Sequence, residues 1–369
     1  MRKSVTDIAV IIPARNEEDR IAACLSALAA QCTARVTIIL VVNNTHDRTA
    51  DVARDTARLH GLHLVTLERS LAAEQGVGTA RRIGCNNALR NMPDLRYILT
   101  TDADCIVGPD WIARNCEHLQ HVDAVCGKVD LITAETGNLD GMDRHLATLE
   151  GTYRTLVQQL FARHAPGCAD IDATHGEAAG ASLAFTTEAY LAVGGFSTVK
   201  CGEDRRIARA LRDAGRKVRH ADDVTVQASC RLSGRAAGGM ADALKARING
   251  EDYMIDDCLP PADWMIDRVA RKTLGPWPAH VPAEFRLKVR DLPHHIRMLK
   301  DFENSEGRML APIGPVAAAS WSHPDVQQPA KGSAIVPADP DVQSVLPAKD
   351  RISAISQLNM SALSAAKGA

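Results

Sequence analysis

The sequence has few aromatic residues and no long uninterrupted apolar run. Phe, Trp and Tyr make up 4% of its 369 residues, although hydrophobic residues as a group reach 46%. This composition favours a helix-covered sheet over an aromatic-rich sandwich or barrel. No stretch approaches the ~20 apolar residues of a membrane-spanning helix, and the apolar run after Met1 is too short for a signal peptide. We therefore expect a cytoplasmic protein, with peripheral membrane contact left open.

The chain also lacks an excess of positive charge and closely spaced cysteines. The formal net charge is -2, so no basic surface points to a nucleic-acid partner. Ten cysteines are present, but none form a CxxC pair of the kind that holds zinc. We expect them to be small buried apolar residues in a reducing compartment.

The first hundred residues alternate between two periodicities. Continuous β-branched runs such as "IAVIIP" are typical of strands buried on both faces. The segments between them have apolar residues at helical spacing, and one ends at Gly61. Strand and helix in alternation predict a doubly wound, mostly parallel sheet. The expected strands are 8–13, 36–42, 62–67 and 96–100, and the expected helices are 16–31, 48–61 and 79–91.

The later sequence continues this pattern and then loses it. Long helices are expected at 142–164 and 202–218, and helices at 251–304 are expected to pack on the core. Residues 305–369 are rich in Ala and Pro and have no periodicity, so we expect a largely disordered tail, with one weak helix near 352–363.

Two acidic pairs stand at places suited to chemistry. Asp102 and Asp104 follow an apolar strand, and they project to one side if strand geometry continues through them. Two such carboxylates can share Mg²⁺ or Mn²⁺, although a solvated turn would look the same. Glu203 and Asp204 open a helix, where the dipole favours ionised groups; simple capping is the alternative.

Six segments in order resemble a family 2 glycosyltransferase with the GT-A fold: "VIIPARNEE", "VVNNTHDRTADVA", "GVGTARRIG", "YILTTDADCIVGPDW", "GASLAFTTEAYLAVGGF" and "GEDRRIARAL". The resemblance covers residues 7–239. It implies an α/β fold of GT-A type, a nucleotide-binding, Rossmann-like mixed sheet flanked by helices. Residues 1–250 would form that domain, 251–304 a helical extension and 305–369 the disordered tail.

The resemblance also implies an activity, which is inverting transfer of a sugar from a nucleotide-diphosphate sugar to a hydroxyl acceptor with a divalent cation. Asp104 and Asp102 would hold the metal. Asn43 and Asn44 stand where relatives usually carry Asp, which leaves the base undetermined. The implied donor-binding residues are Pro13, Ala14, Arg15, Glu17, Asn43, Asn44, Arg81, Asp102, Asp104, Arg231 and Arg235.

On the acceptor side, the resemblance implies that Asp204 is the general base, with Glu203 beside it. His175, Glu177, Gly180 and Ala181 would form the acceptor floor, although for the first two a plain loop position is the favoured interpretation. Arg81 or Arg82 would replace a lysine that many relatives carry in the loop at "GVG", with a position on the helix surface as the alternative. His220 is expected to be a surface histidine at a strand end.

Two other functions compete with this interpretation. "DADCI" superficially resembles the DxDx[TV] motif of haloacid-dehalogenase-like phosphatases, but those place it on their first strand, and Cys105 occupies the Thr or Val position. The chain could instead be a catalytically degenerate module that only binds nucleotide sugars, an interpretation kept open by Asn43 and Asn44.

Overall fold

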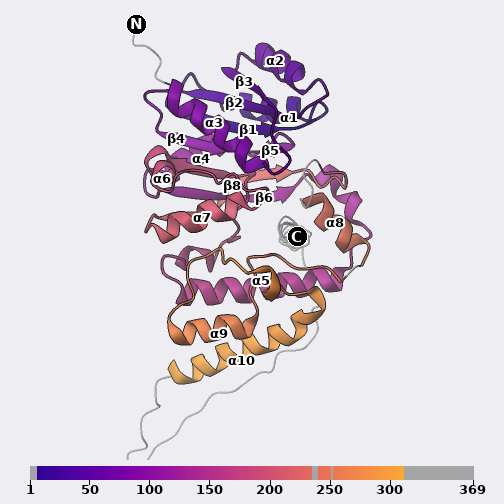
Figure 1. Cartoon of the computed structure of the whole chain (residues 1–369), viewed down its shortest axis with the longest axis vertical. Helices are drawn as coiled ribbons and strands as arrows, with labels where there is room; N and C mark the ends of the chain where they lie inside the picture. Colours follow the sequence, from indigo (N-terminus) through magenta and orange to yellow (C-terminus); the bar gives the residue numbers. More distant parts are fainter. Residues whose placement is uncertain (1–5, 235–239, 251, 311–369) are drawn as a thin grey trace, which may run out of the picture.

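The computed structural model describes residues 6–234, 240–250 and 252–310. Its centre is an eight-stranded sheet with the order β3-β2-β1-β4-β7-β6-β8-β5 (Figure 1). The strands are β1 (Ile8–Ala14), β2 (Val36–Asn43), β3 (Leu64–Arg69), β4 (Tyr97–Thr100), β5 (Cys105–Val107), β6 (Ala124–Leu131), β7 (Leu183–Thr186) and β8 (Val218–Ala228).

The sheet is mixed. The first four strands run parallel, and β7 then pairs antiparallel with both β4 and β6. Strand β8 is parallel to β6, and the short β5 is antiparallel to β8. The four early strands confirm the sequence prediction, and the α/β fold of GT-A type, a mixed sheet flanked by helices, is the one observed.

Helices cover both faces of the sheet, as the continuous apolar strands require. Alternate residues of β1 enter different cores. Val10 and Ile12 pack with α1, α2 and α4, whereas Ala9 and Ile11 pack with α3, α6 and α7. These helices are α1 (Ile21–Ala29), α2 (Thr49–His60), α3 (Val77–Asn91), α4 (Trp111–His118), α6 (Thr187–Ala192) and α7 (Glu203–Asp213).

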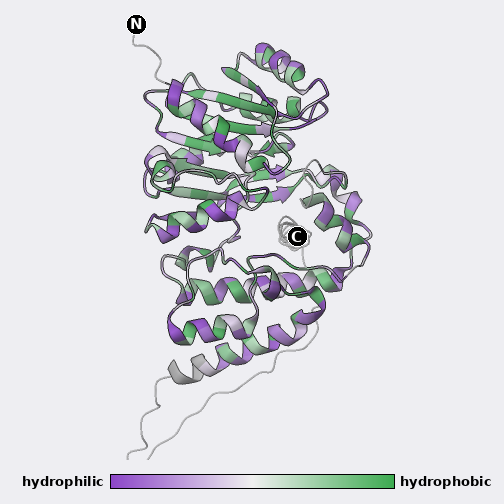
Figure 2. Cartoon of the chain, in the orientation of Figure 1, coloured by the Kyte–Doolittle hydropathy of each residue, from purple (hydrophilic) through white to green (hydrophobic). Residues whose placement is uncertain are grey.

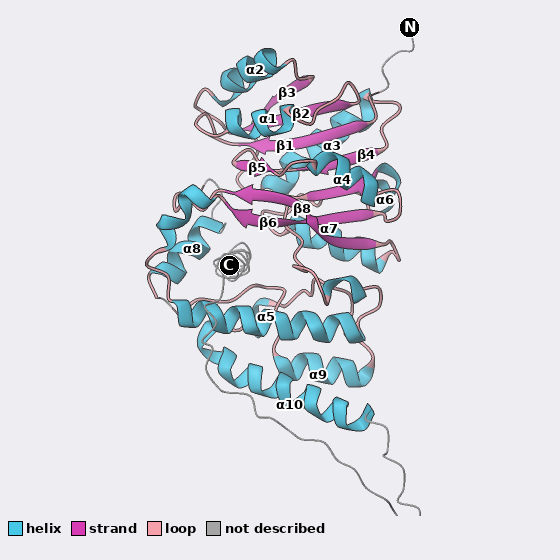
Figure 3. Ribbon diagram, turned by 180° about the vertical axis from the view of Figure 1, so that it is seen from behind, coloured by secondary structure: helices cyan, strands magenta, loops and turns pink. Residues whose placement is uncertain are grey.

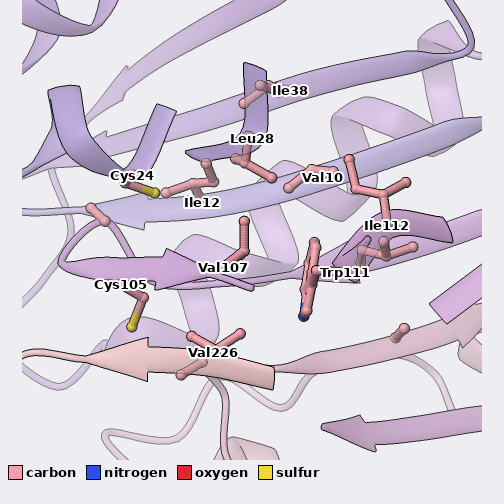
Figure 4. Close-up of a cluster of buried hydrophobic side chains, with 14 of the residues drawn as sticks. Val10, Ile12, Cys24, Leu28, Ile38, Cys105, Val107, Trp111, Ile112 and Val226 are labelled. Atoms are coloured by element: carbon pink, nitrogen blue, oxygen red, sulfur yellow. The ribbon is translucent and has the colours of Figure 1, made fainter. Parts of the chain in front are cut away.

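Figure 4 shows the first of these cores. Val10 and Ile12 on β1 lie close to Cys24 and Leu28 of α1, with Trp111 of α4 beside them. The buried indole of Trp111 donates a hydrogen bond to Ser182 Oγ at 3.0 Å, which satisfies its polar atom inside the core. Green apolar residues are concentrated in the strands in Figure 2, as expected for a sheet buried on two sides.

A second core lies at the end of the molecule opposite β3 (Figures 1 and 3). There α5 (Arg144–His164) packs with α9 (Ala262–Arg271), α10 (Leu292–Leu310) and buried residues between 253 and 289. Helix α8 (Met240–Ile248) lies to one side. Short 3-10 helices occupy Thr133–Leu139, Ala169–Ile171, Ala283–Phe285 and Val289–Asp291.

The boundaries expected from the sequence can be compared with this arrangement. Residues 252–304 do contain helices packed on other parts of the chain, but their main partner is α5, which lies before the boundary predicted at residue 250. Helix α10 continues through residues 305–310, where the tail was expected to begin. The rest of that tail, including the weak helix at 352–363, lies outside the described residues.

All ten cysteines fall within the described residues, and seven of them are buried, which agrees with the expectation of small core residues. Within the part of the chain that the structure describes, no helix combines the length and the apolar character needed to cross a membrane.

Candidate functional site

A cleft of about 680 Å³ opens where β1, β2 and β4 end. This is the edge at which ligands bind in open α/β sheets. The ends of these strands and the first turn of α7 both contribute residues to its lining. The predicted site residues that line the cleft are Pro13, Ala14, Arg15, Glu17, Asn43, Asn44, Arg81, Asp102, Asp104, Gly180, Ala181, Glu203, Asp204 and Arg231.

Three predicted site residues are not among the lining residues. Arg235 lies outside the described residues. His175 donates from Nε2 to the carbonyl oxygen of Cys126 at 3.1 Å and accepts at Nδ1 from the backbone N–H of Glu177 at 3.1 Å. Burial lowers the pKa of His175 to about 3, so its ring is neutral. Glu177 forms an ion pair with Arg154 at 3.1 Å. Both side chains thus have partners away from the cleft.

Residues 102–104, with the sequence DAD, form a turn and do not continue the strand before them. Strand β4 ends at Thr100, and the N–H of Cys105 donates to the carbonyl oxygen of Asp102 at 3.1 Å. The assumption that strand geometry persists through the aspartates is therefore wrong. Both side chains nevertheless line the cleft, with exposed fractions of 32% for Asp102 and 22% for Asp104.

Asp104 sits among other carboxylates. Burial raises its pKa to about 6, Arg231 opposes this shift, and the charges of Asp102 and Glu17 add to it. A cation at this place would relieve that repulsion. The described residues contain no group of three or more His, Cys, Asp or Glu side chains suited to a metal. Mg²⁺ is usually held by one or two carboxylates plus substrate phosphates, and the Asp102 and Asp104 pair fits that requirement.

Arg231 follows β8 and bridges two of these carboxylates. Its Nη1 donates to Glu17 Oε2 at 2.6 Å, its Nη2 also pairs with Glu17, and Nη2 lies 3.1 Å from Asp104 Oδ2. A guanidinium is suited to this two-sided contact because its donors form a planar fork. Arg231 is therefore within reach of any ligand bound at Asp104.

The first turn of α7 presents the second acidic pair. The helix is preceded by Gly202, whose φ of +79° is in the left-handed region that glycine favours. Asp204 accepts from the N–H of Gly180 at 3.1 Å on Oδ2 and from the N–H of Arg205 at 2.8 Å on Oδ1. These two donors fix the orientation of a carboxylate that lines the cleft. Glu203 is fully buried and pairs with Arg81.

Arg81 and His220 are both buried, although the sequence suggested a surface position for each of them. Arg81 is only 2% exposed and pairs with both Asp102 and Glu203. Burial alone would lower its pKa, but the surrounding carboxylates outweigh burial and raise it. His220 is also buried at 2%, and its Nδ1 lies 2.7 Å from a carboxylate oxygen of Asp170. The expectation of a surface histidine is wrong, because α7 and the loop around residue 170 cover this strand end.

The sequence matches a family model described as glycosyl transferase family 2 over residues 9–173. No curated protein matches the chain.

Solved structures also match the chain. Staphylococcus aureus TarS 1–349 in complex with UDP is 17% identical with a TM-score of 0.43, over 60% of each chain. A second TarS structure is matched over only 36% of its own length. The mannosyltransferase PcManGT from Pyrobaculum calidifontis, in complex with GDP-Man and Mn²⁺, is 18% identical with a TM-score of 0.47, over 82% of this chain and 76% of that one. Glucosyl-3-phosphoglycerate synthase from Mycobacterium tuberculosis, with Mg²⁺ and UDP, is 15% identical with a TM-score of 0.42, over 68% and 83%.

The candidate site is shared between the family 2 segment and the sequence after it. The matched residues include Asp102 and Asp104, whereas Gly180, Asp204 and Arg231 come later in the chain. The cleft is therefore completed by α7 and the end of β8, which lie beyond the matched region.

Asn44 has a role in the family 2 domain that the sequence did not reveal. Its Nδ2 donates to the carbonyl oxygen of Leu71 at 2.9 Å, and its Oδ1 accepts from the N–H of the same residue at 2.6 Å. Asn43 donates to the carbonyl oxygen of Ala14 at 3.1 Å. An amide can satisfy a donor and an acceptor together, which a carboxylate cannot. Asn44 therefore holds Leu71 in place, in the segment after β3 that lines the cleft.

That segment is the part of the site that sequence reasoning missed. A Cβ at Gly76 would collide with the backbone of Lys200, so glycine permits these two segments to touch. A glycine at this position can indicate close backbone contact, but Lys200, which it contacts, lies more than a hundred residues away in sequence. The additional lining residues are Leu71, Ala72, Ala73, Gln75, Gly76, Val77, Ala103, Cys105, Ala179, Lys200, Ala228, Ser229, Gly234, Met240 and Ala241.

Proposed function

We propose that this protein is an inverting glycosyltransferase that moves a sugar from a nucleotide-diphosphate sugar to a hydroxyl acceptor. The observation that carries the proposal is that Asp104, which follows β4, and Asp204, in the first turn of α7, line the same cleft in a chain whose residues 9–173 match the family 2 model.

Asp204 is the proposed general base. Its carboxylate is oriented by the N–H groups of Gly180 and Arg205, so it needs little reorganisation before it accepts a proton. The acceptor hydroxyl loses its proton to Asp204 as its oxygen attacks the anomeric carbon. The bond from that carbon to the diphosphate oxygen breaks in the same step, and the nucleoside diphosphate leaves. One displacement inverts the anomeric configuration.

Asp102 and Asp104 are the residues that would hold Mg²⁺ or Mn²⁺, and the bound cation would supply Lewis-acid stabilisation of the leaving diphosphate. Arg231 already contacts Asp104, so it is placed to exchange Glu17 for a phosphate oxygen when donor enters. Arg15 and Asn43 line the same cleft, where the base and ribose of the donor would be held.

Hydrolysis of nucleotide sugars by the enzyme tests this proposal without knowledge of the acceptor. A panel of UDP- and GDP-sugars would be incubated with Mn²⁺, and NMR would give the anomeric configuration of the first sugar released. Inversion is expected, with a loss of at least about 100-fold in Asp204→Asn. Asp213→Asn, on an exposed part of α7, is the control and should behave as wild type. Retention of configuration would refute the role of Asp204, and nucleotide binding without any transfer would favour the degenerate binding module.

A further inference from the structure

Arg81 is implied by the resemblance to contact the nucleotide, yet its guanidinium is committed elsewhere. One Nη atom pairs with Asp102, after β4, and the other pairs with Glu203, at the start of α7. These carboxylates belong to different elements that line the cleft and are separated by about a hundred residues of sequence. Arg81 is 2% exposed, so its guanidinium links the two elements beneath the molecular surface.

Gly180 extends this connection to Asp204. A Cβ at Gly180 would lie 2.5 Å from Nη2 and 2.8 Å from Nη1 of Arg81, so the bare backbone of Gly180 rests on the guanidinium. The N–H of Gly180 donates to Asp204, and its carbonyl oxygen accepts from Thr100 Oγ1 at 2.9 Å. The position of the Arg81 guanidinium therefore bears on three carboxylates, which are Asp102, Glu203 and Asp204.

We infer that Arg81 is a positioning residue that fixes the distance and orientation between the donor-side Asp102 and the acceptor-side Asp204, with Glu203 as its anchor on α7. The inference rests on the proposed function and assigns Glu203 a structural part in it, because a fully buried carboxylate paired with Arg81 has no access to an acceptor hydroxyl. Asp204 remains the residue that meets the substrate.

Arginine is required for this role, because its planar fork offers two separate Nη groups at a fixed distance. A lysine ammonium at the same place can approach Asp102 or Glu203 closely, but it cannot hold both in the same geometry. The Arg81→Lys variant keeps the charge and removes the bridge. Arg90→Lys is the matched control, since Arg90 is an exposed residue in the last turn of the same helix, α3.

The test compares kcat, the donor KM and the Kd for UDP with Mn²⁺ in both variants. For Arg81→Lys we expect kcat to fall by about 100-fold, as for a displaced catalytic group, with KM and Kd changed less than about threefold. Arg90→Lys should match wild type. A Kd raised tenfold or more would make Arg81 a nucleotide ligand and overturn the inference, as would an unchanged kcat.

Gly180→Ala provides a second variant if Arg81→Lys does not fold. Its methyl group pushes on the guanidinium without altering any charge, and we expect the same fall in kcat with the same UDP affinity. Gly137→Ala, where a Cβ meets open space, is the control. Wild-type activity in Gly180→Ala would overturn the inference. Wild-type enzyme measured alongside separates the two proposals: if it transfers no sugar, the proposed function fails, whereas the UDP Kd of Arg81→Lys still tests the role of Arg81.

Discussion

Replacing Asp104 with asparagine should make the ligand-free protein more stable while removing its response to metal. The pKa of Asp104 is raised from 3.8 to about 6, chiefly by burial. Between these values the folded state binds more protons than the unfolded state, so stability falls as pH rises through this window. Each pKa unit corresponds to about 1.4 kcal/mol, so the ionised Asp104 carboxylate lowers the free energy of unfolding by at most about 3 kcal/mol at neutral pH.

Solvent reduces this cost, because the Asp104 side chain keeps 22% of its surface exposed. We therefore expect Asp104→Asn to raise the free energy of unfolding by about 1–2 kcal/mol at pH 7.5. The gain should shrink steadily as pH falls from about 6 through 3.8, and it should vanish below 3.8, where the wild-type carboxyl becomes protonated in both states. Urea unfolding at pH 7.5 and pH 4.5 measures both values.

The same unfolding measurements are then repeated with metal and nucleotide sugar present. With Mn²⁺ and a nucleotide sugar at ~100 times Kd, the wild type should gain about 2.7 kcal/mol, and Asp104→Asn should gain almost nothing. Asp213→Asn, an exposed change of the same kind, should match wild type in both respects. If Asp104→Asn were less stable than wild type at pH 7.5, or kept the full ligand response, the account of this carboxylate as strained and metal-binding would be refuted.

Two further predictions concern other ion pairs. Without nucleotide, Arg231→Met should bind Mn²⁺ about tenfold more tightly than wild type, because Arg231 competes with the cation for Asp104. Titration followed by Mn²⁺ electron paramagnetic resonance measures this affinity, and Arg206→Met, at an exposed position, is the charge-matched control. Unchanged affinity in Arg231→Met would contradict the prediction. Glu150→Gln should lose about 3–5 kcal/mol of unfolding free energy, since it leaves the buried Arg247 without its carboxylate partner at 2.8 Å. Urea unfolding measures that loss, and a change below about 1 kcal/mol would show that the pair contributes little.

The parts of the fold that were predicted from sequence are those whose signal is local. The runs that form β1 and β2 are apolar on both faces, and a strand buried on both sides needs no knowledge of its neighbours to be recognised. Strand β6 was missed because "AVCGKVDL" contains a glycine and polar residues, and its stability comes from pairing with β7 and β8. Helix α5 was predicted, but its packing against α9 and α10 could not be, since those partners lie a hundred residues away.

The candidate site divides in the same way. Each acidic pair was found because its two members lie close together in sequence, and residues of both pairs line the cleft. The pairings of Arg81 and Arg231 were not found, because Arg81 meets Glu203 across 122 positions and Arg231 meets Glu17 across 214. A charged side chain on a helix has the same local pattern whether it faces solvent or a buried carboxylate. Burial, which decides between the two, is a property of the whole fold.

Strand order explains why two segments so distant in sequence form one site. Strand β7 lies antiparallel beside β4, with Thr100 opposite Leu183. The chain therefore enters β7 at the place where it leaves β4, and the residues before Leu183 lie next to the turn that carries Asp102 and Asp104. Gly180 accepts from Thr100 and donates to Asp204 across this junction. Because β7 is antiparallel to β4, Gly180 and the Asp204 carboxylate that it contacts lie at the strand end followed by Asp102 and Asp104. A parallel neighbour would enter from the other end of the sheet and would not bring these residues together.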